Sequence, residues 1–130
     1  MIVVDASAMI QALIGRDADS DLLDALADEV AAPHLLDVEV LSALRGLSLG
    51  GKIELGTAGE AHLDYFALSI TRHEIHPLAD RIWLLRHQYT SSDACYLALA
   101  EALDAPLHTC DAKLVGADHQ AQVRVFPRTH

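Results

Sequence analysis

The sequence lacks several features that mark other classes of protein. No apolar run reaches the length of a transmembrane helix, and the N-terminus has neither the basic region nor the long apolar segment of a signal peptide. The two cysteines, Cys95 and Cys110, form neither a disulfide framework nor a zinc-binding pattern, so we expect both to be reduced thiols. Together these absences predict a cytoplasmic protein that does not enter a membrane.

Basic residues are also scarce. The chain has 9 lysines and arginines against 19 aspartates and glutamates, which gives a formal net charge of −10 at pH 7. Nonspecific affinity for nucleic acid comes from Lys and Arg side chains that neutralise phosphates. The composition therefore argues against broad nucleic-acid binding, and any nucleic-acid function has to overcome this charge.

Apolar residues, in contrast, are abundant. Of the 130 residues, 52% are hydrophobic, which is enough for a sizeable core and too many for a disordered chain. No internal repeat, linker or low-complexity segment divides the sequence. We therefore expect a single domain that spans residues 1–130.

The chain begins with a short apolar run followed at once by polar side chains. Val3 and Val4 favour a buried strand, because the run is too short for a helix. Asp5 and Ser7 come directly after it. In parallel α/β sheets ligands bind just beyond the carboxyl ends of strands, which makes Asp5 a candidate for chemistry. Ser7 has a structural alternative, as the N-cap of a helix that begins at residues 8–10.

Strand-like and helix-like segments alternate along the rest of the chain. The patterns predict helices at 22–27, at 36–47 with Gly50 and Gly51 ending it, at 57–69 with a Thr57–Glu60 capping box, at 78–85 and at 91–103, and one helical turn at 112–115. They predict strands at 30–33, at 71–76, within 105–110 and at 123–126. Trp83 is assigned to packing. This alternation predicts an α/β fold with a mostly parallel sheet covered on both faces.

Further carboxylates fit this pattern. Asp111 comes directly after the strand within 105–110, which repeats the arrangement at Asp5. Asp93 lies in the first turn of the 91–103 helix, where an aspartate that complements the helix dipole is ordinary. Glu39 and Asp37 both flank the apolar stripe of the 36–47 helix. Periodicity leaves the choice between these two open, and a solvated helix edge is the common place for either.

Several carboxylates that converge on one cleft repel one another and raise one another's pKa values unless a cation neutralises them. A hard divalent ion held by oxygen ligands is the physical solution. Mg²⁺ accepts a few carboxylates while it keeps water ligands, and Mn²⁺ prefers similar ligands. The sequence therefore predicts a Mg²⁺ site, with Mn²⁺ as the alternative ion.

Four segments, in this order, resemble the PIN domain, and within it the VapC-type toxins of bacterial toxin–antitoxin pairs. They are residues 3–8 (Val-Val-Asp-Ala-Ser-Ala), Pro33 with 39–44 (Glu-Val-Leu-Ser-Ala-Leu), 93–100 (Asp-Ala-Cys-Tyr-Leu-Ala-Leu-Ala) and 105–111 (Ala-Pro-Leu-His-Thr-Cys-Asp). Their order and spacing are much more specific than any single segment. The resemblance implies a PIN-like three-layer α/β/α sandwich with a mostly parallel central sheet, and a metal-dependent endoribonuclease.

The resemblance also implies which carboxylates act. The acidic residues of the family map onto Asp5, Glu39, Asp93 and Asp111, and this mapping selects Glu39 over Asp37. These four would bind one or two Mg²⁺ or Mn²⁺ ions that activate water for in-line attack on an RNA phosphodiester. The products implied for the family carry a 5′-phosphate and a 3′-hydroxyl.

Two hydroxyl side chains also fit the family pattern, and one position departs from it. Ser7 and Thr109 fall where members often place hydroxyls that support the site. Ser42 stands where many relatives carry Asn three residues after the helical Glu, so we assign that position no role.

The resemblance further implies an RNA substrate, a cognate VapB-type antitoxin whose C-terminal segment lies in a groove near the active site, and a toxin homodimer. The helices at 36–47 and 57–69 are candidates for these surfaces, although an internal core role is the ordinary one. Weak nonspecific binding favours cleavage of one structured RNA, such as tRNA or rRNA, over general degradation. Four basic residues are candidates for a local phosphate-contacting rim: Arg45, Lys52, Arg86 and Lys113.

Three other classes compete with this interpretation. A phosphohydrolase of the haloacid dehalogenase type needs a second Asp two residues after the first, and position 7 is Ser7. A receiver domain needs an acidic pair after the first strand and a phospho-accepting Asp on a central strand, and neither pattern is present. A PIN-like module that binds RNA or protein without cutting it stays open, although the full set of four carboxylates disfavours it.

Overall fold

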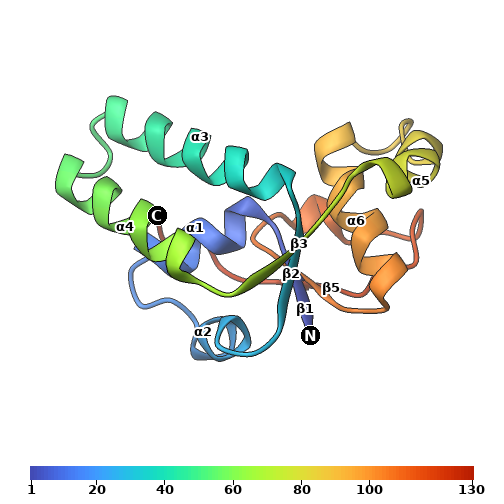
Figure 1. The fold of residues 1–130 in the computed structure, drawn as a ribbon, viewed down its shortest axis with the longest axis horizontal. Coiled ribbons are helices and arrows are strands. Elements are labelled where there is room, and N and C mark those ends of the chain that lie inside the picture. The colour runs from blue at the N-terminus through green and yellow to red at the C-terminus, as the bar shows by residue number, and fades with distance from the viewer.

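The computed structural model describes residues 1–130, which are organised around one five-stranded sheet (Figure 1). The strand order is β3-β2-β1-β4-β5, and all four neighbouring pairs are parallel. The strands are β1 (Ile2–Val4), β2 (Val30–Pro33), β3 (Ile70–His73), β4 (Leu107–Thr109) and β5 (Val123–Val125). The predicted parallel α/β sheet is therefore confirmed.

Helices cover both faces of this sheet (Figure 1). They are α1 (Ala6–Ile14), α2 (Ser20–Leu26), α3 (Leu35–Leu49), α4 (Leu55–Ala67), α5 (Ala79–Leu84) and α6 (Ser91–Leu103), with the short 3₁₀ helices η1 (His76–Leu78) and η2 (Ala112–Leu114). Helices α1 to α4 lie on one side, and α5 and α6 on the other. This arrangement confirms the three-layer α/β/α sandwich. None of the helices is both long and apolar enough to span a bilayer.

The core fills both spaces between sheet and helices. Val3 and Val4 of β1 have no exposed surface, because β1 is the central strand and is covered on both faces. Every residue from 94 to 100 of α6 is buried, whereas α3 buries the stripe Leu36, Val40 and Leu44. Ala43 and Leu47, predicted for the same stripe, are partly buried. The central strand and residues 94–100 of α6 therefore lie wholly within the core.

The start of α1 differs from the prediction. Asp5, rather than Ser7, is the N-cap: its backbone is extended, and its Oδ1 accepts the Ala8 N–H at 3.0 Å. The helix can begin immediately after β1 because the capping carboxylate stands at the strand end itself. Ser7 lies inside the first turn, and this leaves its hydroxyl available for other partners.

Two further boundaries differ. Strand β3 spans 70–73 instead of 71–76, because its pairing with β2 runs out at Pro33 opposite His73. Helix α4 begins at Leu55, so the predicted Thr57–Glu60 capping box lies within the helix. Glu54 takes the N-cap position with an extended backbone and without a side-chain cap hydrogen bond.

The predicted packing role of Trp83 is wrong. The short α5 segment directs Leu78 and Leu85, which flank it, into the core. Trp83 lies on the outer side with 66% of its surface exposed. The Arg86 guanidinium lies 4.5 Å from the centre of its ring and donates a hydrogen bond to the Trp83 carbonyl.

Candidate active site

Asp5 stands at the carboxyl end of β1 and is 7% exposed. Its Oδ1 accepts hydrogen bonds from the Ser7 hydroxyl at 2.7 Å and from the Ala8 N–H at 3.0 Å. Its Oδ2 accepts the Thr109 hydroxyl. Burial raises the pKa of Asp5 and the charge of Asp93 adds to the rise, while these three hydrogen bonds oppose it. The side chain is therefore fixed in one orientation and carries a charge that burial disfavours.

The ends of β1 and β4 are joined by the two hydroxyl side chains predicted to support the site. The Ser7 Oγ that donates to Asp5 also accepts the Cys110 N–H at 2.8 Å. The Thr109 Oγ1 that donates to Asp5 also accepts the Asp111 N–H at 3.0 Å. These two bridges hold the loop after β4, and with it Asp111, beside the end of β1.

Asp93 and Asp111 come from two other segments, the start of α6 and the loop after β4. Asp93 lies in the first turn of α6, whose N-cap is Thr90, and Asp111 is the N-cap of η2. Burial raises the pKa of Asp93, and the negative charge of Asp111 raises it further, whereas Lys113 lowers it. The two carboxylates are thus close enough to repel each other.

Glu39 reaches the same region from α3. Its Oε1 accepts the Tyr96 hydroxyl, and Tyr96 belongs to α6 on the other side of the sheet end. Burial raises the pKa of Glu39; the Tyr96 hydrogen bond opposes this rise, and the charges of Asp5 and Asp93 add to it. The four predicted carboxylates therefore lie at the carboxyl-terminal end of the sheet strands. Each of them is close enough to at least one other for their negative charges to repel.

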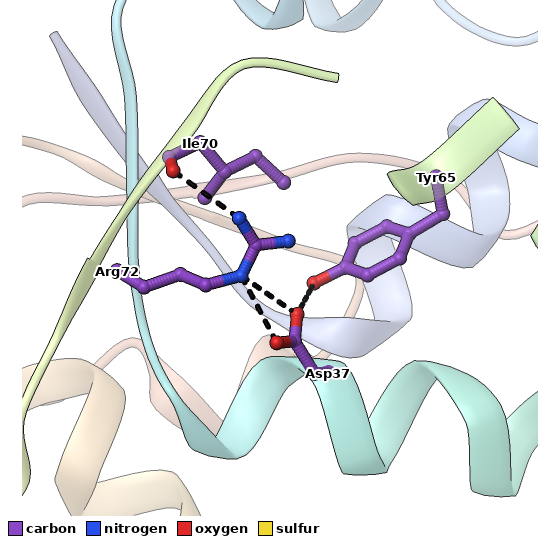
Figure 2. A network of polar contacts seen from close by, with 4 residues as sticks. All are labelled: Asp37, Tyr65, Ile70 and Arg72. Atoms are coloured by element: carbon purple, nitrogen blue, oxygen red, sulfur yellow. Dashed lines mark hydrogen bonds and ion pairs between the residues drawn. The ribbon is translucent and has the colours of Figure 1, made fainter. Parts of the chain in front are cut away.

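Asp37, the alternative to Glu39, takes part in a different network (Figure 2). Its Oδ1 accepts the Tyr65 hydroxyl at 2.6 Å, and its two carboxylate oxygens accept the Arg72 Nε–H at 2.9 and 3.0 Å. Arg72 also donates to the Ile70 carbonyl at 3.3 Å. Asp37 thus joins α3 to α4 and β3, away from the other carboxylates, and its charge is already neutralised.

The donor chemistry of the site suits a hard divalent ion. All four carboxylates offer oxygen ligands, none forms an ion pair with Lys or Arg, and three of them have raised pKa values, so an added cation relieves their repulsion. No three His, Cys, Asp or Glu side chains converge closely enough to hold an ion by themselves. The residues therefore fit an ion such as Mg²⁺, which takes one or two carboxylates and keeps several waters, and they do not form a structural zinc site, which needs four protein ligands rich in Cys and His.

Only one of the four basic residues predicted to form a phosphate-contacting rim lies near these carboxylates. Lys113 is the one of the four basic residues whose charge acts on a site carboxylate, Asp93. Arg86 is occupied by Trp83 on α5. Arg45 and Lys52 are exposed on α3 and just beyond its end, with no ion pair.

Two residues beside the site were not predicted from the sequence. Tyr96, which binds Glu39, lies three residues after Asp93 and hence on the same face of α6, so helical spacing could have identified it. The charge of Arg128 acts on the Cys110 thiol, whose pKa is raised mainly by burial. No local pattern signals Arg128, because its position depends on contacts between the C-terminal segment and α1.

Solved structures of other proteins share this fold. PAE2754 from Pyrobaculum aerophilum superposes with a TM-score of 0.71 at 22% identity, over 93% of this chain and 86% of that one. A toxin–antitoxin complex from Klebsiella pneumoniae contains a chain that matches with a TM-score of 0.65 at 19% identity, over 92% of this chain and 99% of that one. At such low identity these matches establish the architecture alone.

The sequence comparison goes further. Ribonuclease VapC1 of Mycobacterium tuberculosis is 44% identical over 119 residues, which cover 88% of this chain and 89% of that protein. The family model described as the PIN domain matches residues 2–119. This match includes all four carboxylates and both supporting hydroxyls. The chain belongs to the PIN domain family.

Proposed function

We propose that this protein is a metal-dependent endoribonuclease toxin of the VapC type, which hydrolyses a structured RNA such as tRNA or rRNA. The observation that carries the proposal is the set of Asp5, Glu39, Asp93 and Asp111 at one sheet edge, with no ion pair and with mutual repulsion. The name of the relative at 44% identity supports the reaction class.

Each residue of the site has a role in this proposal. Asp5, Asp93 and Asp111 would hold the ion, one or two of them directly and the rest through its water ligands, and Glu39 would reach it through water. When bound, Mg²⁺ or Mn²⁺ lowers the pKa of a water and stabilises charge on the leaving oxygen. Ser7 and Thr109 fix the orientation of Asp5 through the hydrogen bonds described above.

Proton transfer is assigned to a carboxylate. Tyr96 holds the Glu39 carboxylate in place through its hydroxyl, which positions Glu39 to accept a proton. Glu39 would accept a proton from the attacking water while the water oxygen bonds to phosphorus. The bond from phosphorus to the 3′-oxygen breaks, and that oxygen takes up a proton from solvent. The products are then a 5′-phosphate and a 3′-hydroxyl.

The test is cleavage of total tRNA by the purified protein in Mg²⁺, in Mn²⁺ and in excess chelator. We expect cleavage in either ion and none with chelator. Asp5→Asn should lower the rate roughly 100-fold or more, because several kcal/mol of transition-state stabilisation depend on the ion. Asp24→Asn, which removes the same charge from an exposed position on α2, is the matched control and should leave the rate unchanged.

A module that binds RNA or protein without cutting it is the second candidate. The observation in its favour is that no three potential ligands converge on one point. RNA binding by the wild type without cleavage in any divalent ion would favour this candidate and contradict the enzyme.

The antitoxin and the homodimer complete the proposal. A toxin–antitoxin complex among the structural neighbours supports an antitoxin partner. Helices α3 and α4 carry exposed apolar side chains suited to protein contacts, among them Val38, Leu63 and Phe66. Inhibition of tRNA cleavage by the co-expressed antitoxin, and sedimentation of the free toxin, test the two partners separately.

A further inference from the structure

A groove of about 480 Å³ lies between α1, α3 and the C-terminal segment. Ser7 and Ile10 line it from α1, Gly46 and Leu47 from α3, and Arg128 and His130 from the C-terminal segment. Ser7 is the residue whose hydroxyl donates to Asp5. Ser7 therefore connects the wall of the groove to Asp5 of the candidate active site.

The wall formed by the C-terminal segment is held in place by Gln11, whose side chain is 1% exposed. Gln11 Oε1 accepts the Thr129 N–H at 2.7 Å, and Gln11 Nε2 donates to the Thr129 hydroxyl at 2.7 Å. The same hydroxyl donates to the Arg16 carbonyl at 2.6 Å, so it both accepts one hydrogen bond and donates another. Figure 1 shows the chain end beside α1, as these bonds require.

The same amide also fixes the His130 ring. Oε1 is an acceptor only, so the His130 Nδ1 that lies 2.9 Å from it carries the proton. The C-terminal residues are thus tied to a buried side chain of α1 on both sides of the Thr129 peptide. Arg128 consequently projects from an anchored segment and not from a free tail.

Arg128 is a cation without a carboxylate partner in a chain whose net charge is −10. The ion pairs of the protein use Arg72, Arg81 and Arg124, whereas Arg128 is exposed and its charge acts on Cys110, beside Ser7. The opposite wall has no side chain at Gly46, and the space there is open. A chain with regularly spaced negative charges can therefore approach α3 closely and still reach the guanidinium.

We propose that this groove holds the sugar–phosphate backbone of the RNA next to the cleaved bond, with the Arg128 guanidinium bound to a backbone phosphate. The inference rests on the proposed ribonuclease function and assigns the path of its substrate. An arginine fork matches the oxygens of a phosphate and makes two parallel hydrogen bonds to them. One such contact, placed at the acidic site, offsets locally the repulsion that the net charge imposes on RNA.

The test measures RNA binding in chains that all carry Asp5→Asn, so that the RNA stays intact. Affinity for fluorescein-labelled oligouridine is followed by fluorescence anisotropy in Mg²⁺ over a series of salt concentrations. Arg128→Gln should weaken binding roughly tenfold at low salt and reduce the slope of log affinity against log salt by about one. Arg128→Lys should restore the slope but only part of the affinity, because an ammonium group does not form the paired hydrogen bonds.

Arg124→Gln is the matched control, since it removes the same charge from an arginine that is already paired with Asp21 at 2.6 Å. Its affinity should stay within about twofold of the parent, because surface charges far from the phosphates contribute little. Equal affinity and equal salt slope for Arg124→Gln and Arg128→Gln would overturn the inference. Thermal unfolding of each variant verifies that the exposed substitutions leave the fold intact.

The outcome is separable from that of the proposed function. Failure of the wild type to cleave tRNA contradicts the ribonuclease, while binding that depends on Arg128 still supports the groove as an RNA site. If Arg128→Gln leaves RNA affinity unchanged but weakens binding of the cognate antitoxin, the groove is a protein-docking surface, and the RNA assignment is wrong.

Discussion

Helix α3 carries two carboxylates, two residues apart, in opposite electrostatic settings. Asp37 accepts a hydrogen bond from Tyr65 and is neutralised by Arg72. Glu39 also accepts from a tyrosine, Tyr96, but faces other carboxylates and no arginine. The tyrosine contact is common to both, so the arginine is what distinguishes a carboxylate that holds the fold together from one available to an added cation.

The first way to sharpen this comparison is Glu39→Gln, for which we expect the largest effect. The amide keeps the shape of the side chain but offers no negative oxygen, so cleavage of tRNA should fall roughly 100-fold. The free energy of unfolding should stay the same or rise, because repulsion from Asp5 and Asp93 is relieved. Initial rates and urea unfolding measure the two effects. Retained activity would show that the unpaired carboxylate is not needed.

The matched change, Asp37→Asn, should do the opposite. It leaves the guanidinium of Arg72 half-buried without its partner, and we expect a loss of about 2 kcal/mol in the free energy of unfolding. Cleavage per folded molecule should stay within about twofold, because Asp37 points away from the site. Urea unfolding followed by circular dichroism gives the first value. A large loss of activity in a fully folded Asp37→Asn protein would break the comparison.

The smallest effect is expected at a third carboxylate, Glu101, which is paired with Arg81. Arg81 donates to both its oxygens, at 2.7 and 2.9 Å, and lowers its pKa. A lowered pKa in the folded state contributes stability above the unfolded pKa of about 4.3, and this contribution is lost as the pH falls through the folded value. Glu101→Gln should therefore cost about 1 kcal/mol at neutral pH.

Thermal unfolding of wild type and Glu101→Gln across an acid pH series tests this sign. The two stability curves should converge on acidification, because the wild-type carboxylate is then protonated as well. A difference that grew as the pH fell would contradict the lowered pKa of Glu101.

Local patterns were sufficient to predict the frame of the site. An apolar run followed by a carboxylate placed Asp5 and Asp111 at strand ends, and parallel pairing of β1 with β4 then brings the two ends together. The stripe of Leu36, Val40 and Leu44 depends on helical spacing alone, and the structure confirms it. These features could be predicted because each is determined within about a dozen residues.

The remaining features depend on distant partners. Helical spacing cannot choose between Glu39 and Asp37, because both flank the same stripe; the choice is made by Arg72, which lies 35 residues after Asp37. The end of β3 is set by the end of its neighbour β2, and the place of Arg128 by Gln11. Such contacts join segments that are far apart along the chain, so no periodic pattern in the sequence predicts them.

The exposed position of Trp83 has a spectroscopic consequence. It is the single tryptophan of the chain and is 66% exposed in the native state, so its emission is already close to that of an indole in water. Unfolding will change this fluorescence little. The same residue is a sensitive optical reporter for any molecule that covers α5, since loss of water around the ring shifts its emission to shorter wavelength.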